Sequence, residues 1–385
     1  MYHIKKFFNT YITIIFLFLG CFFAGNQLLV HYVGNYFNAN ELEFSFLIGA
    51  MYIGSLTMVL VIGEVSERIG KRLGVVISAI FYSIGAILIA IAGSIELTIF
   101  AFLIFGIGAG GIEGVLFSLI GDYNGPYTHK IMNISQASFS VGAVTGPLLI
   151  TVLTKVISYK YIYGIIWLFM ALLAVMFFIS RDIDTFAKKE HKIKKGFIAF
   201  KLIKNPAMIV FMATLMIAIG CETAVTYWLI NYYELLGVVG LGAIGLSLYW
   251  VSSIPGRLLG AYAKNQGRYL SVGFILASVG ILLLLFLPTP ILKFIGVTML
   301  GMALAPVYPS ISTLGANLFP NNSAAAFSLM VFSGGLGGAL AQPIIGVVAG
   351  TSSIKTVYGA ISIIMILLSI MIVVGVKLSK RKVLV

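Results

Sequence analysis

Long apolar segments recur along the whole of this 385-residue chain and constrain its fold more than any other feature. A helix needs about 20 apolar residues to cross a bilayer, where the backbone must satisfy its own hydrogen bonds. Charged residues make up only 10% of the chain, whereas a soluble domain has about 25%. We therefore predict an all-α membrane protein with twelve transmembrane helices, over residues 9–33, 44–65, 73–93, 97–120, 131–155, 160–179, 206–233, 240–262, 268–287, 291–315, 323–349 and 354–378.

One long polar stretch divides these segments into six and six. We expect an N-terminal six-helix half over residues 1–179, a cytoplasmic central loop over 180–205 and a C-terminal six-helix half over 206–385. No nucleotide-binding loop is present in the sequence, so we do not expect ATP to be the energy source.

Three short matches relate the two halves at nearly the same offset. They predict two pseudo-symmetric halves related by duplication, an architecture found in a large class of secondary transporters. The matches join Gly20-Cys21 to Gly220-Cys221 (offset 200), residues 63–71 to 260–268 (offset 197) and residues 142–147 to 338–343 (offset 196).

The distribution of lysine and arginine predicts the orientation, because the cytoplasmic loops of membrane proteins retain these residues. With both termini inside, 21 of the 25 basic residues fall in predicted cytoplasmic segments. We therefore expect a multi-pass protein of the cytoplasmic membrane with both termini in the cytoplasm. The same distribution accounts for the net charge of +13 without a nucleic-acid partner, although the basic central loop could also contact the membrane surface.

Residues 63–72 fit the pattern G-x-x-x-(D/E)-(R/K)-x-G-(R/K)-(R/K), the signature of the loop between helices 2 and 3 in the major facilitator superfamily. The glycines allow close helix approach and a tight turn. The charged residues can form an ion-pair latch with the acid at the end of the fourth helix; an ordinary charged loop is the alternative. We expect a cytoplasmic gate made of Gly63, Glu67, Arg68, Gly70, Lys71, Arg72 and Asp122.

An acidic residue, Glu113, lies within the glycine-rich fourth segment, FGIGAGGIEGVLFSLIGDY. It falls about seven residues, roughly 10 Å, before the end of the predicted helix. Charged side chains are costly inside a membrane, so an intramembrane acid is a functional-site candidate. Because burial disfavours the charged form, we expect Glu113 to exchange a proton with whichever side is open. A structural carboxyl at a helix contact is the alternative.

A second acid, Glu222, lies near the midpoint of the seventh segment. By helical spacing Glu222, Thr226 and Tyr233 lie near one face, so a carboxylate, a hydroxyl and an aromatic ring could converge. Such groups suit a sugar, which offers hydroxyl groups and an apolar ring face. Trp228, Tyr232 and Tyr233 could instead form an interfacial aromatic belt.

Amide side chains inside the predicted helices are further candidates for solute binding. Buried amides must find hydrogen-bond partners, and in a transporter the solute can be one of them. For any single amide, a hydrogen bond between helices is the alternative. Together with Phe139, the candidates are Asn26, Gln27, Asn133, Gln136 and Gln342.

Five of the predicted helices carry residues that resemble one branch of the major facilitator superfamily, the fucose permease and its relatives, which are fucose–galactose–glucose:proton symporters. The resemblance implies monosaccharide:proton symport, with Glu113 in the place of the helix 4 glutamate that serves proton coupling. The residues that carry it are 108–113, Asn133-Ile134-Ser135-Gln136 with Phe139 and Gly142, Gly220-Cys221-Glu222 with Trp228, Tyr308-Pro309 with Leu314-Gly315, and the run 334–346.

The sequence departs from that branch in helix 1, where Gln27 follows Asn26 in the place of an acid. Glutamine cannot carry a proton. The resemblance therefore implies that Glu222 supplies the second acid, or that the stoichiometry and the substrate differ.

A drug:proton exporter is the main alternative, because Gly142, Gly146 and Pro147 match the core of the antiporter motif in helix 5. Against it, Ile150-Thr151 replaces the glycine pair expected next, and helix 4 lacks the arginine typical of that group. A sensor or assembly factor that does not transport is a third class, for which no signalling domain is evident.

We therefore predict a secondary transporter that imports a small polar solute, most simply a monosaccharide, with protons by alternating access. We expect a monomer in the lipid bilayer that is not an enzyme and has no catalytic residues, cofactor or metal. The identity of the solute, proton against sodium coupling and import against export stay open. The expected proton carriers are Glu113 and Glu222, and the expected solute-binding residues are Asn26, Gln27, Asn133, Gln136, Phe139, Glu222, Thr226, Trp228 and Gln342.

Overall fold

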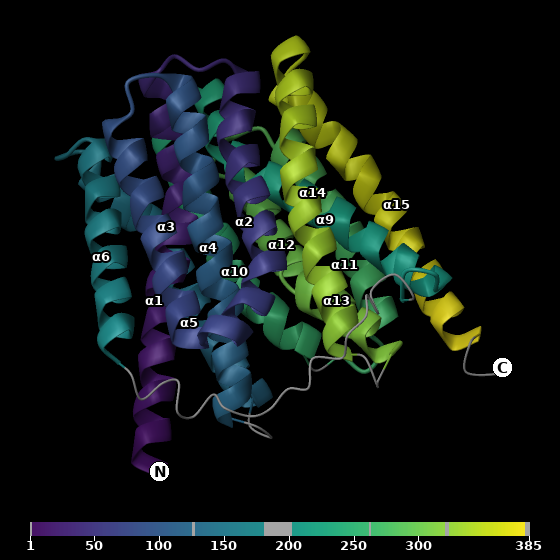
Figure 1. Cartoon of the computed structure of the whole chain (residues 1–385). Helices are drawn as coiled ribbons and strands as arrows, with labels where there is room; N and C mark the ends of the chain where they lie inside the picture. Colours follow the sequence, from purple (N-terminus) through teal and green to yellow (C-terminus); the bar gives the residue numbers. More distant parts are fainter. Residues whose placement is uncertain (1, 125–127, 181–201, 262, 320–322, 382–385) are drawn as a thin grey trace. The chain divides into compact units, whose positions relative to one another are not determined.

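The computed structural model describes residues 2–124, 128–180, 202–261, 263–319 and 323–381, and all regular structure in these ranges is α-helical. For some positions inside the helices only the backbone is described. The helices, labelled as in Figure 1, are α1 (Tyr2–Tyr36), α2 (Glu41–Ile69), α3 (Lys71–Ile91), α4 (Ile95–Asn124), α5 (Thr128–Leu153), α6 (Tyr159–Ile179), α9 (Pro206–Leu235), α10 (Val239–Ala261), α11 (Gln266–Phe286), α12 (Lys293–Leu304), α13 (Val307–Asn317), α14 (Ser323–Thr351) and α15 (Ile354–Arg381).

The predicted fold class is confirmed, since helices occupy all twelve predicted spans. The span expected over residues 291–315 is present but divided into two helices, because α12 ends at Leu304 and α13 begins at Val307. Pro306 lies at this break, where its missing N–H and its ring disfavour a continuous helix. Within the described ranges, eleven segments are long and apolar enough to cross a membrane, with α12 and α13 counted as one. Helix α10, which is not among these eleven segments, has 23 residues and is therefore of similar length.

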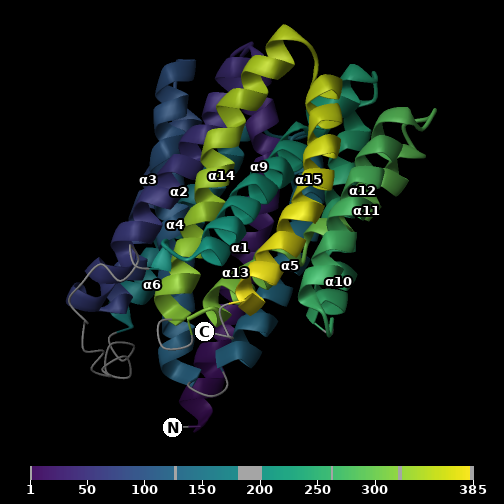
Figure 2. The ribbon, with the colours of Figure 1, turned by 90° about the vertical axis from the view of Figure 1, so that its right-hand side faces the viewer.

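The chain divides into two compact units, Met1–Ile193 and Lys194–Val385, each with its own helix pairs. In the first unit α1 packs on α5, α4 packs on α2 and α3, and α6 covers α3. In the second unit α9 packs on α14, α12 packs on α10 and α11, and α15 covers α11 (Figure 2). The scheme of pairs is therefore the same in both units, in line with the sequence offset. One difference is that α15 also packs on α9, whereas its counterpart α6 has few contacts with α1.

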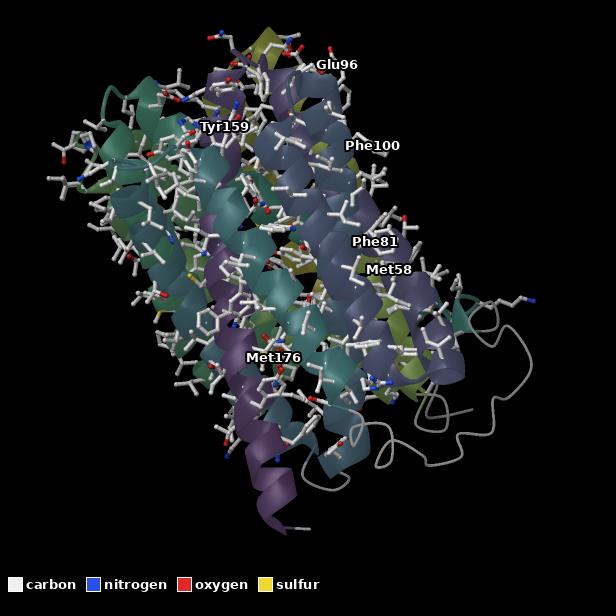
Figure 3. The ribbon with its side chains drawn as sticks, turned by 60° about the vertical axis from the view of Figure 1, so that its left-hand side comes forward. Met58, Phe81, Glu96, Phe100, Tyr159 and Met176 are labelled. Carbon is white, nitrogen blue, oxygen red and sulfur yellow. The ribbon has the colours of Figure 1, made fainter. Side chains whose placement is uncertain are left out.

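Large apolar side chains cover the outer faces of the helices. In the N-terminal unit Phe81 of α3, Phe100 of α4 and Met176 of α6 point outward from the bundle (Figure 3), and they are 37%, 54% and 48% exposed. Extensive exposed apolar surface of this kind marks contact with a membrane or a partner. Together with the length of the helices, it indicates a protein embedded in lipid.

Helix α4 lies in backbone contact with both α2 and α3. A Cβ atom added to Gly106 would overlap the carbonyl oxygen of Met51 in α2, and one added to Gly108 would overlap the backbone of Tyr82 in α3. Small residues permit this close approach. Inside a membrane the hydrophobic effect does not drive helices together, so close van der Waals packing of this kind stabilises their association. Within the next turn, a Cβ atom on Gly110 would overlap the carbonyl oxygen of Ser55 in α2, and one on Gly111 would overlap the side chain of Ser78 in α3.

Glycines also set the contact between the first and fifth helices of each unit. A Cβ atom on Gly142 of α5 would overlap the carbonyl oxygen of Leu17 in α1, and one on Gly337 of α14 would overlap that of Met216 in α9. These two contacts join equivalent helix pairs, so a glycine permits close backbone packing at the same pair of helices in each unit.

We expect Gly106→Ala to destabilise the protein by about 1–3 kcal/mol, because the methyl group must displace α4 from α2. Gly164→Ala in α6 is the matched control, since nothing lies within 4 Å of the methyl group added there. The measurement is the apparent Tm of each purified variant in detergent. Equal Tm values for the two variants would show that the contact between α2 and α4 does not need a glycine.

Candidate functional site

A cavity of about 70 Å³ opens inside the N-terminal unit among α1, α2, α3 and α4. Its wall combines one carboxyl group, one amide, two phenols and one hydroxyl with apolar groups. A buried water needs about 10–15 Å³ of such space, so the cavity can hold several waters or part of a polar solute. The lining residues are Phe23, Asn26, Met51, Tyr52, Ser55, Tyr82, Phe105, Ala109 and Glu113.

Glu113 lies deeper in its helix than the sequence suggested. Helix α4 continues to Asn124, so Glu113 is roughly 17 Å from the helix end at 1.5 Å per residue. Its side chain is exposed at the cavity wall, and none of the nine lining residues is basic. A carboxyl group in this position can accept hydrogen bonds from solute hydroxyl groups and can exchange a proton with water that enters the cavity.

The glycines of α4 create this wall. Gly106 and Gly110 hold α4 against Met51 and Ser55, and Gly108 holds it against Tyr82. All three neighbours line the cavity beside Glu113. The glycine pattern noted in the sequence therefore determines which side chains surround the acid.

Asn26 is fixed by two neighbours on other helices. Its Oδ1 accepts a hydrogen bond of 2.7 Å from the hydroxyl of Tyr163 in α6, and its Nδ2 donates to Sδ of Met51 in α2 at 3.3 Å. Asn26 is only 1% exposed. The amide therefore lies in the cavity wall in a fixed orientation. It forms hydrogen bonds between helices, and it is also placed where a solute could bind.

The other N-terminal solute-binding candidates are Gln27, Asn133, Gln136 and Phe139, and the structure describes three of these side chains. Gln27 is buried on α1, while Gln136 and Phe139 are half-buried on α5. The Phe139 ring centroid is 5.7 Å from that of Phe23, which lines the cavity. The side chain of Asn133 lies outside the described part of the structure.

The expected cytoplasmic gate is described only in part. Gly70 joins α2 to α3 with φ 95°, a backbone conformation that favours glycine. Lys71 donates from Nζ to the carbonyl oxygen of Ser118 in α4 at 3.5 Å, and Arg72 donates to the carbonyl oxygen of Phe178 at the end of α6. These contacts tie the start of α3 to two neighbouring helices. The side chains of Glu67, Arg68 and Asp122, and the surroundings of Gly63, lie outside the described part, so the latch stays a prediction.

Glu222 sits in a polar cluster with α10. The hydroxyl of Tyr249 donates a hydrogen bond of 2.7 Å to Oε1 of Glu222. Arg257, further along α10, interacts electrostatically with Glu222 and with Tyr249. The carboxyl group therefore has a hydrogen-bond donor on the neighbouring helix.

Trp228 and Gln342, expected to bind solute, bind each other. The indole Nε1 of Trp228 donates to Oε1 of Gln342 in α14 at 3.2 Å, and Nε2 of Gln342 donates to Oγ1 of Thr223 in α9 at 3.0 Å. Trp228 is 1% exposed, so its ring offers no open face to a sugar in this conformation. The Thr226 hydroxyl donates to the backbone carbonyl of Glu222 at 3.1 Å.

The expected convergence of Glu222, Thr226 and Tyr233 is wrong. Eleven residues of helix separate Tyr233 from Glu222 by roughly 17 Å, so the two side chains do not meet. The Tyr233 hydroxyl instead donates to the carbonyl oxygen of Pro290 at 3.2 Å. The interfacial belt is wrong as well, since Trp228, Tyr232 and Tyr233 are all buried.

Sequence reasoning missed Tyr163, Tyr249 and Arg257. The orientation argument counted Arg257 with the cytoplasmic basic residues, although it lies four residues inside the end of α10. A basic residue within an apolar segment is as costly as an acid there, so it could have been noticed. The two tyrosines carry no such signal, because their role depends on which helices pack together.

Comparison with known proteins identifies the family. The family model for the Major Facilitator Superfamily matches residues 10–342. The chain belongs to this superfamily. It is accordingly a multi-pass membrane transporter, which is the class to which the sequence motifs assigned it.

Similar proteins include transporters of several solutes. The glucose/mannose transporter GlcP of Bacillus subtilis is 25% identical over 261 residues, which are 64% of this chain and 64% of GlcP, slightly less than two thirds of that protein. The nucleoside transporter NupG superposes with a TM-score of 0.77 at 16% identity, covering 96% of this chain and 99% of NupG. The E. coli fucose:proton symporter FucP superposes with a TM-score of 0.66 at 17% identity, covering 96% and 99%. At these identities the two structures show the fold alone.

We expect Tyr163→Phe to destabilise the transporter by about 1 kcal/mol, because Asn26 loses a buried hydrogen bond. Tyr161→Phe, on the same helix and 69% exposed, is the matched control. Thermal unfolding of both purified variants provides the measurement. An unchanged Tm in Tyr163→Phe would indicate that Asn26 is not held by this bond.

Proposed function

We propose that this transporter catalyses proton-coupled symport of a monosaccharide by alternating access, into the cell across the cytoplasmic membrane. The observation that carries the proposal is Glu113, a carboxyl group deep in α4 in a cavity wall that contains no basic residue. Protonation there neutralises a charge that is costly within a membrane. We propose both termini to be cytoplasmic and the working unit to be a monomer.

The groups around Glu113 support a sugar as the solute. Asn26, Ser55 and Glu113 can bond to hydroxyl groups, while the rings of Tyr52 and Tyr82 can pack on an apolar ring face. GlcP, described as a glucose/mannose transporter, is similar in sequence, and the fucose:proton symporter FucP shares the fold. The remaining candidates, among them Gln27, Asn133, Gln136 and Phe139, extend the proposed site within the same unit.

An exporter that exchanges protons for an amphipathic solute is the alternative. One observation favours it: Gly142 and Gly146 of the antiporter-like run lie in backbone contact with α1, at the carbonyl oxygens of Leu17 and Cys21. The same contact recurs in the C-terminal unit, so packing alone accounts for it. We therefore place symport first.

The test is pH recording in lightly buffered, de-energised cells while monosaccharides are added one at a time. Symport predicts alkalinisation of the medium with at least one sugar. Silence across the panel would contradict proton–sugar symport. Sodium-dependent uptake and dye efflux would then test sodium coupling and the exporter.

We expect Glu113→Gln to abolish uphill accumulation of the sugar, leaving equal concentrations inside and outside, because glutamine cannot carry a proton. Exchange of labelled for unlabelled sugar should persist, since it needs no net proton transfer. Glu96→Gln is the matched control, as Glu96 is an exposed carboxylate at the N-terminal end of the same helix (Figure 3). Accumulation at the wild-type level in Glu113→Gln would remove Glu113 from the coupling role.

A further inference from the structure

Helices α11 and α15 of the C-terminal unit pack side by side (Figure 2). Two contacts show that they run in opposite directions and fix their register. A Cβ atom on Gly267 would lie 2.8 Å from Cγ2 of Val376, and the hydroxyl oxygens of Ser278 and Ser362 are 2.9 Å apart. The first turn of α11 is therefore level with the last turns of α15.

Four basic residues, which we call the basic cluster, lie at this end of the helix pair. Lys264 and Arg268 flank the start of α11, and Lys377 and Lys380 belong to the last turns of α15. At the register of the two helices, Lys377 is level with the residues between Lys264 and Gly267. All four side chains are exposed, and among the described residues none of them has a hydrogen bond or an ion pair with a protein group.

The C-terminal unit offers no acid to neutralise the basic cluster. Residues 194–385 include two acids, Glu222 and Glu234, and both are on α9. Helix α9 begins where α15 ends, because a Cβ atom on Gly375 would lie 2.7 Å from the ring of Phe211. Glu222 is sixteen residues beyond the start of α9, about 24 Å by helix rise, and Glu234 is at its far end. The positive charge at this end is therefore uncompensated within the unit.

The equivalent cation of the N-terminal unit is bound within the protein. Lys71 corresponds to Arg268 at the sequence offset of 197. Lys71 is 9% exposed and donates from Nζ to the carbonyl oxygen of Ser118 in α4. Arg268 is exposed and makes no such bond. The duplicated position thus carries a charge in both units, and in the C-terminal unit its donors face outward.

On each helix the cations continue into a stripe of exposed apolar side chains. Residues spaced by three, four and seven positions lie on one face of a helix. Retention of cations in cytoplasmic loops explains how many lie at this end, but not why they align with the lipid-facing side of two helices. The stripes run from Arg268 through Val272, Ile275 and Val279 on α11, and from Lys377 through Val374, Ile370 and Ile366 on α15.

An anionic phospholipid has the chemistry that fits this surface. Its phosphate attracts juxtamembrane cations, its acyl chains pack on apolar side chains, and arginine can bind a phosphate with two parallel hydrogen bonds. We propose that Lys264, Arg268, Lys377 and Lys380 bind the phosphate of an anionic phospholipid whose acyl chains lie along α11 and α15. In the proposed orientation this lipid belongs to the cytoplasmic leaflet. The site does not depend on which solute is transported.

Native mass spectrometry of the full-length protein in detergent tests the site with phosphatidylglycerol and phosphatidylcholine that carry the same acyl chains. The wild type should bind phosphatidylglycerol at least about tenfold more tightly. Arg268→Gln/Lys377→Gln should weaken phosphatidylglycerol binding about 25-fold, since each cation near an anionic surface contributes about fivefold. Its binding of phosphatidylcholine should not change. Equal affinities of the wild type for the two lipids, or an unchanged preference in this variant, would overturn the proposal.

Matched controls separate the site from net charge and from free phosphate. Lys155→Gln/Lys355→Gln removes two other exposed cations, one of them at the opposite end of α15, and should keep the lipid preference. Arg268→Lys/Lys377→Arg should keep it as well, because the charges remain. Loss of the preference in the first control would assign it to net charge and contradict the site. Glycerol phosphate in excess should not displace the lipid; displacement would indicate a site for free phosphate instead.

Discussion

Three helix backbones meet in the N-terminal unit at distances that only glycine permits. Gly106 and Gly108 place α4 directly against the backbones of α2 and α3. Because lipid is as apolar as leucine, close packing of this kind, rather than burial from water, holds such helices together. The same contacts bring Met51 and Tyr82 to the cavity wall beside Glu113. Helix packing and the composition of the candidate site therefore have one cause.

Charge compensation is the second constraint on this chain, and the two units meet it differently. The N-terminal unit places an acid in a cavity where no basic residue lines the wall. In the C-terminal unit, the hydroxyl of Tyr249 in α10 donates a hydrogen bond to the acid Glu222. The duplicated helix scheme thus supports two different electrostatic environments.

Much of the fold could be predicted from the sequence, because a bilayer requires long apolar helices and hydropathy reveals them directly. The tenth span was predicted as well, but it is divided into two helices at Pro306. At the candidate site, Glu113 and Asn26 could be identified as costly residues inside apolar segments, and they line one cavity. Tyr163, which holds Asn26, could not be identified, since a tyrosine in an apolar helix gives no sign of its partner.

The sequence by itself determined the helices, the duplication, the superfamily and the acids that a membrane makes expensive. These properties follow from composition and spacing, which act along the chain. Only the tertiary structure decided that Trp228 bonds to Gln342, that Tyr233 bonds to Pro290 and that Glu222 lies beside Tyr249. Each of these contacts joins residues far apart in the sequence, and which of them form depends on helix packing that local sequence patterns do not encode.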